Sequence, residues 1–222
     1  MIGYYDYTVI LTYLSLISSV MGMFCAAAGH MRLAVACLAF SGLLDAFDGK
    51  VARTKKNRTH GEKQFGIQLD SLCDMVCFGA LPAVICYHLG MHSFVGMGIL
   101  CLYVLAGLIR LAWFNVKEEE RQSQTDENRK YYQGMPITSI AVILPLFYAM
   151  GTLFPEHFGL VLHFVMAITG ALFVINFPFR KPNNKELAVM IAVVGLAVLY
   201  ILACHRWGAK LPWHWQLRRS TR

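Results

Sequence analysis

Apolar residues dominate this chain in seven long runs, which are separated by short stretches that carry charge, glycine or proline. Each run is close to the roughly twenty residues that an α-helix needs to cross the hydrocarbon core of a bilayer. The surface helices of a soluble domain would keep one polar face, and these runs keep almost none. We therefore predict membrane-spanning helices over 8–28, 32–49, 67–89, 94–116, 137–154, 158–178 and 186–205.

The composition supports the same fold class, because 57% of the residues are hydrophobic and only 15% are charged. The expected fold is all-α, a polytopic transmembrane helical bundle. We expect residues 1–205 to form a single membrane-embedded domain and residues 206–222 to form a basic, tryptophan-containing tail. Residues 1–7 lack the positive charge of a signal peptide, so the first span is expected to be retained.

Charge predicts the orientation of the bundle. Basic residues crowd the connection between the second and third spans, which the positive-inside rule places in the cytosol. They are Lys50, Arg53, Lys55, Lys56, Arg58 and Lys63. Seven crossings would then leave the tail at 206–222 outside, against the same rule, so the span count and the path of the tail stay open. The formal charge of +7 suits an anionic lipid surface better than nucleic acid, because the basic residues sit beside the spans.

Four aspartates interrupt the second and third spans near this connection, at Asp45, Asp48, Asp70 and Asp74. Spacings of three and four residues put each pair on one face of a helix. The short connection favours antiparallel neighbours, so both pairs are expected to meet. Ionised carboxylates at this density need a compensating cation, and all-oxygen ligation is typical of Mg²⁺, Mn²⁺ or Ca²⁺. We predict that all four aspartates bind metal.

Small residues and an arginine accompany the acidic pairs. Gly49 and Ala52 remove side-chain bulk beside the first pair, and Arg53 adds a planar donor that suits a phosphate. Gly66 lies one turn before Asp70 and would open the facing helix in the same way. The pattern indicates a phosphorylated ligand lying against the helix. The alternative is a set of helix-end ion pairs with glycines for close packing, which explains single residues better than all eight in this order.

These eight residues read DxxDGxxAR…GxxxDxxxD, which resembles the signature of the CDP-alcohol phosphotransferases. Segments 78–82 (FGALP), 110–115 (RLAWFN) and 134–136 (GMP) are similar to the phosphatidylserine synthase branch of that family. The resemblance covers roughly residues 41–138, and twelve residues separate Arg53 from Gly66, more than is usual in the family. It implies a six-helix catalytic core, here with an additional C-terminal span.

The resemblance also implies a reaction, the transfer of a phosphatidyl group from CDP-diacylglycerol to L-serine with release of CMP. Asp74 would take the acceptor's proton in addition to binding metal. The nucleotide and diphosphate side of the pocket would be formed by Gly49, Ala52, Arg53 and Gly66. The cofactor would be Mg²⁺ or Mn²⁺, with Ca²⁺ as a further option, and the enzyme would be a homodimer.

Arg110 and Asn115 lie near the cytosolic end of the fourth span and are candidates for binding the acceptor. Helix-end capping and snorkelling are the alternative reading of both residues.

Two other functions stay open. The same donor could react with glycerol 3-phosphate or inositol phosphate, because the signature concerns the CDP donor and not the acceptor. A cation transporter is the alternative of another class, since intramembrane carboxylates can line ion pathways. The expected location is a bacterial or archaeal plasma membrane, with the site facing the cytosol among membrane lipids and no role for nucleic acid.

Overall fold

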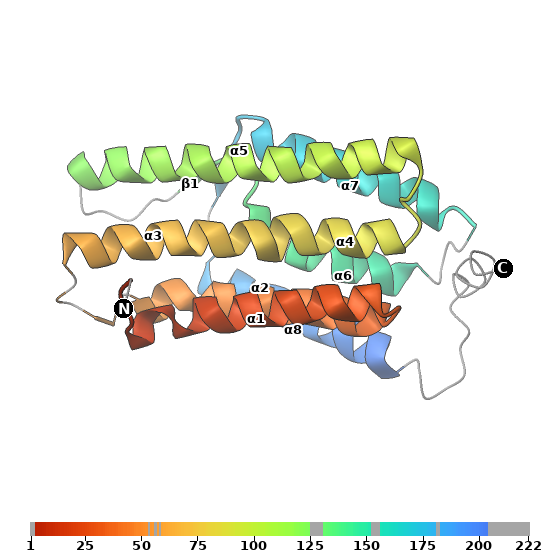
Figure 1. Cartoon of the computed structure of the whole chain (residues 1–222), viewed down its shortest axis with the longest axis horizontal. Coiled ribbons are helices and arrows are strands. Elements are labelled where there is room, and N and C mark those ends of the chain that lie inside the picture. Colours follow the sequence, from red (N-terminus) through yellow and green to blue (C-terminus); the bar gives the residue numbers. More distant parts are fainter. Residues whose placement is uncertain are drawn as a thin grey trace.

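The structure is a bundle of long helices that lie roughly parallel to one another (Figure 1). It is a computed structural model that describes residues 3–52, 54–55, 57, 59–124, 131–151, 156–180 and 183–203. The α-helices are α1 (Ile10–Ala27), α2 (Met31–Ala52), α3 (His60–Asp74), α4 (Leu81–His88), α5 (Phe94–Gln124), α6 (Ile140–Met150), α7 (Phe158–Val174) and α8 (Asn184–Ala203). Short turns complete them: the 3₁₀ turns η1 (Tyr7–Val9) and η3 (Ile137–Ser139), and the π-helix η2 (Met75–Ala80), which joins α3 and α4 into one rod.

The predicted all-α polytopic class is confirmed, because each predicted span coincides with one of these helical segments. Within the described ranges, four segments are long and apolar enough to cross a membrane, namely Tyr7–Ala27, Gly61–His88, Phe94–Arg121 and Asn184–Ala203. Shorter apolar helices cover Ile137–Met150 and Phe158–Val174. Such a set of helices belongs to an integral membrane protein.

Helix α3 begins seven residues before the start of the predicted span, at His60 instead of residue 67. Thr59 explains the early start: its side chain accepts a hydrogen bond from the backbone of Glu62, whose carboxylate accepts one from the Thr59 backbone. This capping box satisfies two backbone donors that would otherwise lack partners. Gly66 and Asp70 consequently lie well inside the helix.

A small antiparallel ribbon departs from the all-α prediction. Strand β1 (Tyr131–Gln133) pairs with β2 (Pro178–Arg180), with Tyr132 opposite Phe179. The polar stretch after the fourth predicted span begins as a continuation of α5, which extends to Gln124. Ion pairs one turn apart, Lys117 with Glu120 and Glu118 with Arg121, stabilise this extension.

Close packing of small and polar residues positions α2 at the centre of the bundle. Between α1 and α2, the Ser19 and Ser41 hydroxyls lie 2.8 Å apart, and Ser41 donates to the Ser15 carbonyl at 3.0 Å. Toward α6, a Cβ on Gly42 would lie only 2.5 Å from the Cβ of Ala141. The backbone of α2 is thereby held close to both neighbours.

The π-helix η2 follows directly after Asp74. A π turn accommodates one residue more than an α turn, so it rotates the helix that follows it. The Tyr103 hydroxyl from α5 donates to the Phe78 carbonyl inside this turn at 2.6 Å, and both side chains are fully buried. The π-helix thus fixes the rotation of the apolar helix α4 relative to the aspartate-bearing helix α3.

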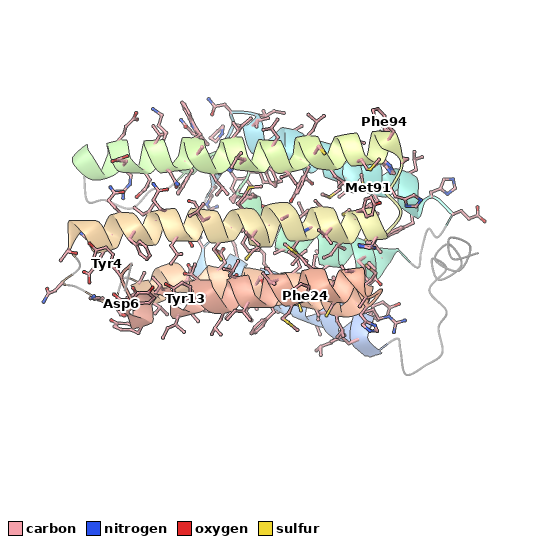
Figure 2. All side chains as sticks on the ribbon, viewed as in Figure 1. Tyr4, Asp6, Tyr13, Phe24, Met91 and Phe94 are labelled. Carbon is pink, nitrogen blue, oxygen red and sulfur yellow. The ribbon has the colours of Figure 1, made fainter. Side chains whose placement is uncertain are left out.

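The N-terminal segment, residues 3–9, fastens the connection between α2 and α3. Lys55 Nζ lies 2.8 Å from Asp6 Oδ2 and 2.8 Å from Glu62 Oε1. The Tyr4 ring packs edge-on against Phe65 with centroids 5.6 Å apart, and Tyr4 and Asp6 lie at the same end of the molecule (Figure 2). The hydrogen bond from Lys55 lowers the pKa of Asp6 to about 2 and lowers that of Glu62, while the two carboxylates raise the pKa of Lys55.

Helix α8 lies at the edge of the bundle. Only 11% of its most apolar 18-residue stretch is buried inside the protein. Most of its surface is therefore available to lipid. The expected basic tail, at 206–222, falls outside the described residues.

Candidate active site

Three of the predicted metal ligands meet in the structure. Asp45 on α2 and Asp70 and Asp74 on α3 each place a carboxylate oxygen within 4.8 Å of the others. Asp48, one turn further along α2, lies within hydrogen-bonding range of Asp70, and Asp45 lies within the same range of Asp74. All four side chains are half-buried. The two acidic pairs are thus brought together from neighbouring helices, and their roles as ligands stay predictions.

The oxygen separations fit a hard divalent cation. Six oxygens around Mg²⁺ are about 3.0 Å apart when adjacent and about 4.2 Å apart when opposite, and the corresponding values for Ca²⁺ are about 3.4 and 4.8 Å. Three carboxylates whose oxygens lie within 4.8 Å of one another match the span of a Ca²⁺ shell, and a closure of at most about 0.6 Å would bring them to the span of a Mg²⁺ shell. The Asp45, Asp70 and Asp74 triad can therefore hold a divalent metal ion.

The small residues of the signature flank this triad. Gly49 lines a cavity beside Asp48, and Ala52 is the last residue of α2. Gly66 is half-buried on α3, one turn before Asp70. Arg53 lies outside the described residues, so its contact with a phosphate stays a prediction.

Asn115 on α5 contacts the acidic helix directly. Its Oδ1 accepts a hydrogen bond from Ser71 Oγ at 2.8 Å, and its Nδ2 donates to Gln68 Oε1 at 3.5 Å. Ser71 follows Asp70 in the chain, so Asn115 packs against the part of α3 that carries the candidate metal ligands. Its role toward an acceptor stays a prediction.

Arg110 is buried, with 7% of its surface exposed, and contacts the backbone of the ribbon. Its guanidinium donates to the Gln133 carbonyl at the end of β1. The next residue, Gly134, has φ +72°, and a Cβ there would lie 3.2 Å from Arg110 Nη1. The side chain thus supports the turn after β1, and acceptor binding by Arg110 stays a prediction.

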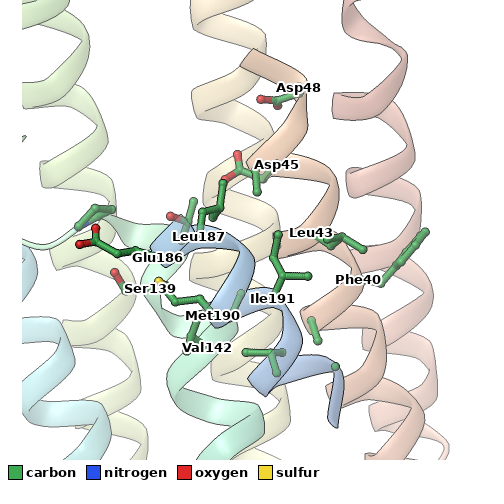
Figure 3. Close-up of a pocket in the computed structure, with 18 of the residues that line it drawn as sticks. Phe40, Leu43, Asp45, Asp48, Ser139, Val142, Glu186, Leu187, Met190 and Ile191 are labelled. Atoms are coloured by element: carbon green, nitrogen blue, oxygen red, sulfur yellow. The ribbon is translucent and has the colours of Figure 1, made fainter. Parts of the chain in front are cut away.

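A cavity of about 1240 Å³ adjoins the acidic cluster (Figure 3). Asp45 and Asp48 lie on its wall, together with Lys50. The rest of the α2, α6 and α8 walls is mainly apolar; it includes Phe40, Leu43, Val142, Met190, Ile191 and Val198. One continuous space therefore joins a carboxylate cluster to an apolar groove at the lipid-facing edge of the bundle.

The cavity also has a polar rim, which no motif in the sequence indicates. It consists of Thr138, Ser139, Arg180, Asn184 and Glu186. One available signal was the pair of opposite charges, Arg180 and Glu186, that flanks a short connection on the expected cytosolic side. Their approach depends on the ribbon, which places β2 beside the start of α8.

Comparisons with known proteins agree with the signature. A family model described as CDP-alcohol phosphatidyltransferase matches residues 8–179. Two curated proteins named CDP-diacylglycerol–serine O-phosphatidyltransferase are similar to the chain. The Helicobacter pylori protein is 31% identical over 196 residues, which cover 84% of this chain and 76% of that protein. The Saccharomyces cerevisiae protein is 39% identical over 109 residues, 48% of this chain and 38% of that one.

An archaeal protein is also similar. The archaetidylserine synthase of Methanothermobacter thermautotrophicus is 36% identical over 141 residues, which cover 63% of this chain and 53% of that protein.

Proposed function

Because the chain belongs to the CDP-alcohol phosphatidyltransferase family, we propose that it transfers a phosphatidyl group from CDP-diacylglycerol to L-serine, giving phosphatidylserine and CMP. The observation that carries this proposal is the aspartate triad, whose member Asp45 also lines a cavity that continues as an apolar groove. The relatives described above, two serine O-phosphatidyltransferases and an archaetidylserine synthase, support serine as the acceptor.

The cavity suits an amphiphilic donor. A CDP-linked lipid carries a diphosphate at one end and acyl chains at the other, and the cavity has carboxylates for a cation at one end and apolar walls from α2, α6 and α8 along the rest. Acyl chains in such a groove would stay in an apolar environment while the diphosphate meets water-soluble reactants. The lipid substrate would then react without leaving the membrane.

Asp45, Asp70 and Asp74 would hold a divalent cation, with Asp48 alongside, and we infer Mg²⁺ or Mn²⁺ from the all-oxygen set. When bound, the cation would neutralise negative charge on the diphosphate. The serine hydroxyl oxygen forms a bond to the phosphorus that carries diacylglycerol, and the bond from that phosphorus to the CMP oxygen breaks. The hydroxyl proton passes to the Asp74 carboxylate, which acts as general base.

We further infer that the acidic cluster faces the cytosol of a bacterial or archaeal cell, since the basic connection after α2 lies beside it. The homodimer implied by the family resemblance stays a prediction.

An acceptor panel tests the proposal. Purified protein is supplied with CDP-dioleoylglycerol, Mg²⁺ or Mn²⁺, and L-serine, glycerol 3-phosphate or inositol phosphate, and both CMP and the lipid product are measured. We expect CMP release that requires L-serine and the metal, with phosphatidylserine as the product. Turnover with glycerol 3-phosphate and not with L-serine would refute the acceptor. Absence of CMP with every acceptor, together with cation flux in proteoliposomes, would favour a transporter.

A further inference from the structure

Arg180 and Glu186 form an oppositely charged pair on the cavity that also contains Asp45 and Asp48. We propose that this pair recognises the zwitterion of an amino-acid acceptor, with Arg180 contacting the carboxylate and Glu186 the ammonium group. The inference rests on the proposed function, because it takes L-serine as the acceptor.

The position of the pair is suited to a second substrate. Arg180 ends β2 and Glu186 lies in the first turn of α8, whereas the acidic residues Asp45 and Asp48 project from α2. Figure 3 shows Glu186 and Ser139 on the other side of the cavity from Asp45. An acceptor held by the pair would share one continuous space with the carboxylates that surround the candidate metal site.

The geometry of the pair leaves both charges available to a ligand. Arg180 Nη2 and Glu186 Oε1 are 3.8 Å apart, beyond the roughly 2.7–2.9 Å of a charge-assisted hydrogen bond. Their side chains are 63% and 50% exposed. A separated and solvated ion pair contributes little to the stability of the fold. A ligand that replaces the contact between Arg180 and Glu186 therefore costs little folding stability. A guanidinium can then make two parallel hydrogen bonds to a carboxylate.

Both side chains start from anchored backbone. Arg180 pairs in register with Tyr131 of β1, and the neighbouring Gln133 carbonyl is held by Arg110. Glu186 Oε2 accepts a hydrogen bond from the Asn183 backbone at 2.7 Å, which leaves Oε1 on the side of Arg180. The backbone that carries each charge is therefore anchored on the same side of the cavity.

Charge balance favours a zwitterion over an anionic acceptor. One positive and one negative side chain together match the single carboxylate and single ammonium of an amino acid. Glycerol 3-phosphate or an inositol phosphate brings only negative charge, which Glu186 would repel. The pair thus supplies a physical reason for the choice between acceptors.

Removing one charge from the protein and one from the ligand gives a direct test. Wild type, Arg180→Gln and Glu186→Gln are assayed for KM and kcat with L-serine, with ethanolamine, which lacks the carboxylate, and with 3-hydroxypropanoate, which lacks the ammonium group. Arg180→Gln is expected to raise KM for L-serine roughly 10- to 100-fold and to abolish the preference for L-serine over ethanolamine. Glu186→Gln should likewise abolish the preference over 3-hydroxypropanoate.

Matched variants separate recognition from folding. Glu186→Gln keeps an oxygen for the Asn183 backbone, and Arg180→Lys keeps a positive charge, so it should restore part of the affinity for L-serine. Lys185→Gln removes an exposed charge beside Glu186 that does not line the cavity, and it should leave KM unchanged.

KM for CDP-diacylglycerol should stay within about twofold in every variant. Two outcomes overturn the inference alone: unchanged KM for L-serine in both glutamine variants of an enzyme that uses serine, or a selective rise in KM for CDP-diacylglycerol. A wild-type protein that ignores L-serine but uses another acceptor would overturn the proposed function as well.

Discussion

At the scale of single residues, the spacing of the aspartates carries most of the information about the candidate site. Separations of three and four residues could be converted into helix faces without knowing the fold, and Asp45, Asp70 and Asp74 do converge. Arg110 shows the limit of this reasoning. Its contact is a backbone carbonyl on a strand more than twenty residues away in the chain, which no local pattern indicates.

Asp70 is the residue that best tests the metal site, because its carboxylate belongs to the triad and also lies beside Asp48. Asp70→Asn removes one charge at nearly constant volume. We expect turnover to fall by about 10²- to 10⁴-fold, corresponding to the several kcal/mol that a correctly held cation supplies. The loss of turnover is measured as the rate of CMP release across a Mg²⁺ titration. The affinity of the variant for Mn²⁺, measured directly, should fall as well.

Glu119→Gln is the matched control, since it removes an exposed carboxylate from the polar end of α5. Both variants should unfold at the wild-type temperature in detergent. Wild-type turnover in a folded Asp70→Asn protein would exclude Asp70 from the metal site.

At the scale of elements, the N-terminal segment and the connection between α2 and α3 act together through Lys55. Its ion pairs with Asp6 and Glu62 join the start of α1, the end of α2 and the start of α3. Because α2 and α3 carry the two acidic pairs, this junction lies directly beside the elements that must meet at the site.

The junction should make stability depend on pH in a defined range. The pKa of Asp6 is lowered from 3.8 to about 2, so its ion pair stabilises the fold fully above pH 3.8 and is lost as the pH falls toward 2. Glu62, whose pKa is also lowered, acts in the same direction. The pKa of Lys55 is raised above 10.5, so its contribution is lost only above that pH.

Lys55→Met should therefore lower Tm by roughly 1–4 °C near neutral pH, and this difference from wild type should vanish near pH 2. Thermal unfolding of the detergent-solubilised protein measures it, with Lys63→Met as a control for losing an exposed lysine. A difference that persists unchanged at pH 2 would show that the ion pairs are not its cause.

Element boundaries could be predicted only where a local signal is strong. The apolar runs located every helix, yet the start of α3 was placed too late, because the capping box of Thr59 and Glu62 lies within a basic stretch that resembles a loop. The three-residue strands β1 and β2 are too short for alternation to indicate them. They form where the segment after α7 pairs with residues 131–133, which lie beside Arg110 of α5.

At the scale of the whole molecule, the cavity could not be predicted, since it arises from the packing of α2 against α6 and α8 and not from any one of them. Gly195 on α8 lines its apolar part, and a Cβ there would meet no atom within 4 Å. The space is open to a larger side chain.

Gly195→Phe should therefore obstruct the groove without a steric clash. If acyl chains occupy the groove, KM for CDP-dioleoylglycerol should rise about tenfold, equivalent to losing the burial of one or two methylene groups, while KM for a dihexanoyl analogue and for L-serine stays unchanged. Gly98→Phe on α5 is the control, because it also enters open space but does not line the cavity. An equal rise for long and short chains would argue against acyl chains in the groove.

The π-helix at Met75–Ala80 has a consequence for how this protein can change over evolutionary time. Deleting or inserting one residue there would turn α4 by about 100° relative to α3, and either Asp74 or the apolar face below it would point the wrong way. Side chains in this stretch are constrained by packing, because Cys77, Phe78 and Gly79 are buried, but a conservative substitution leaves the rotation intact. A gap changes the rotation itself, so this short turn tolerates conservative substitutions far better than gaps.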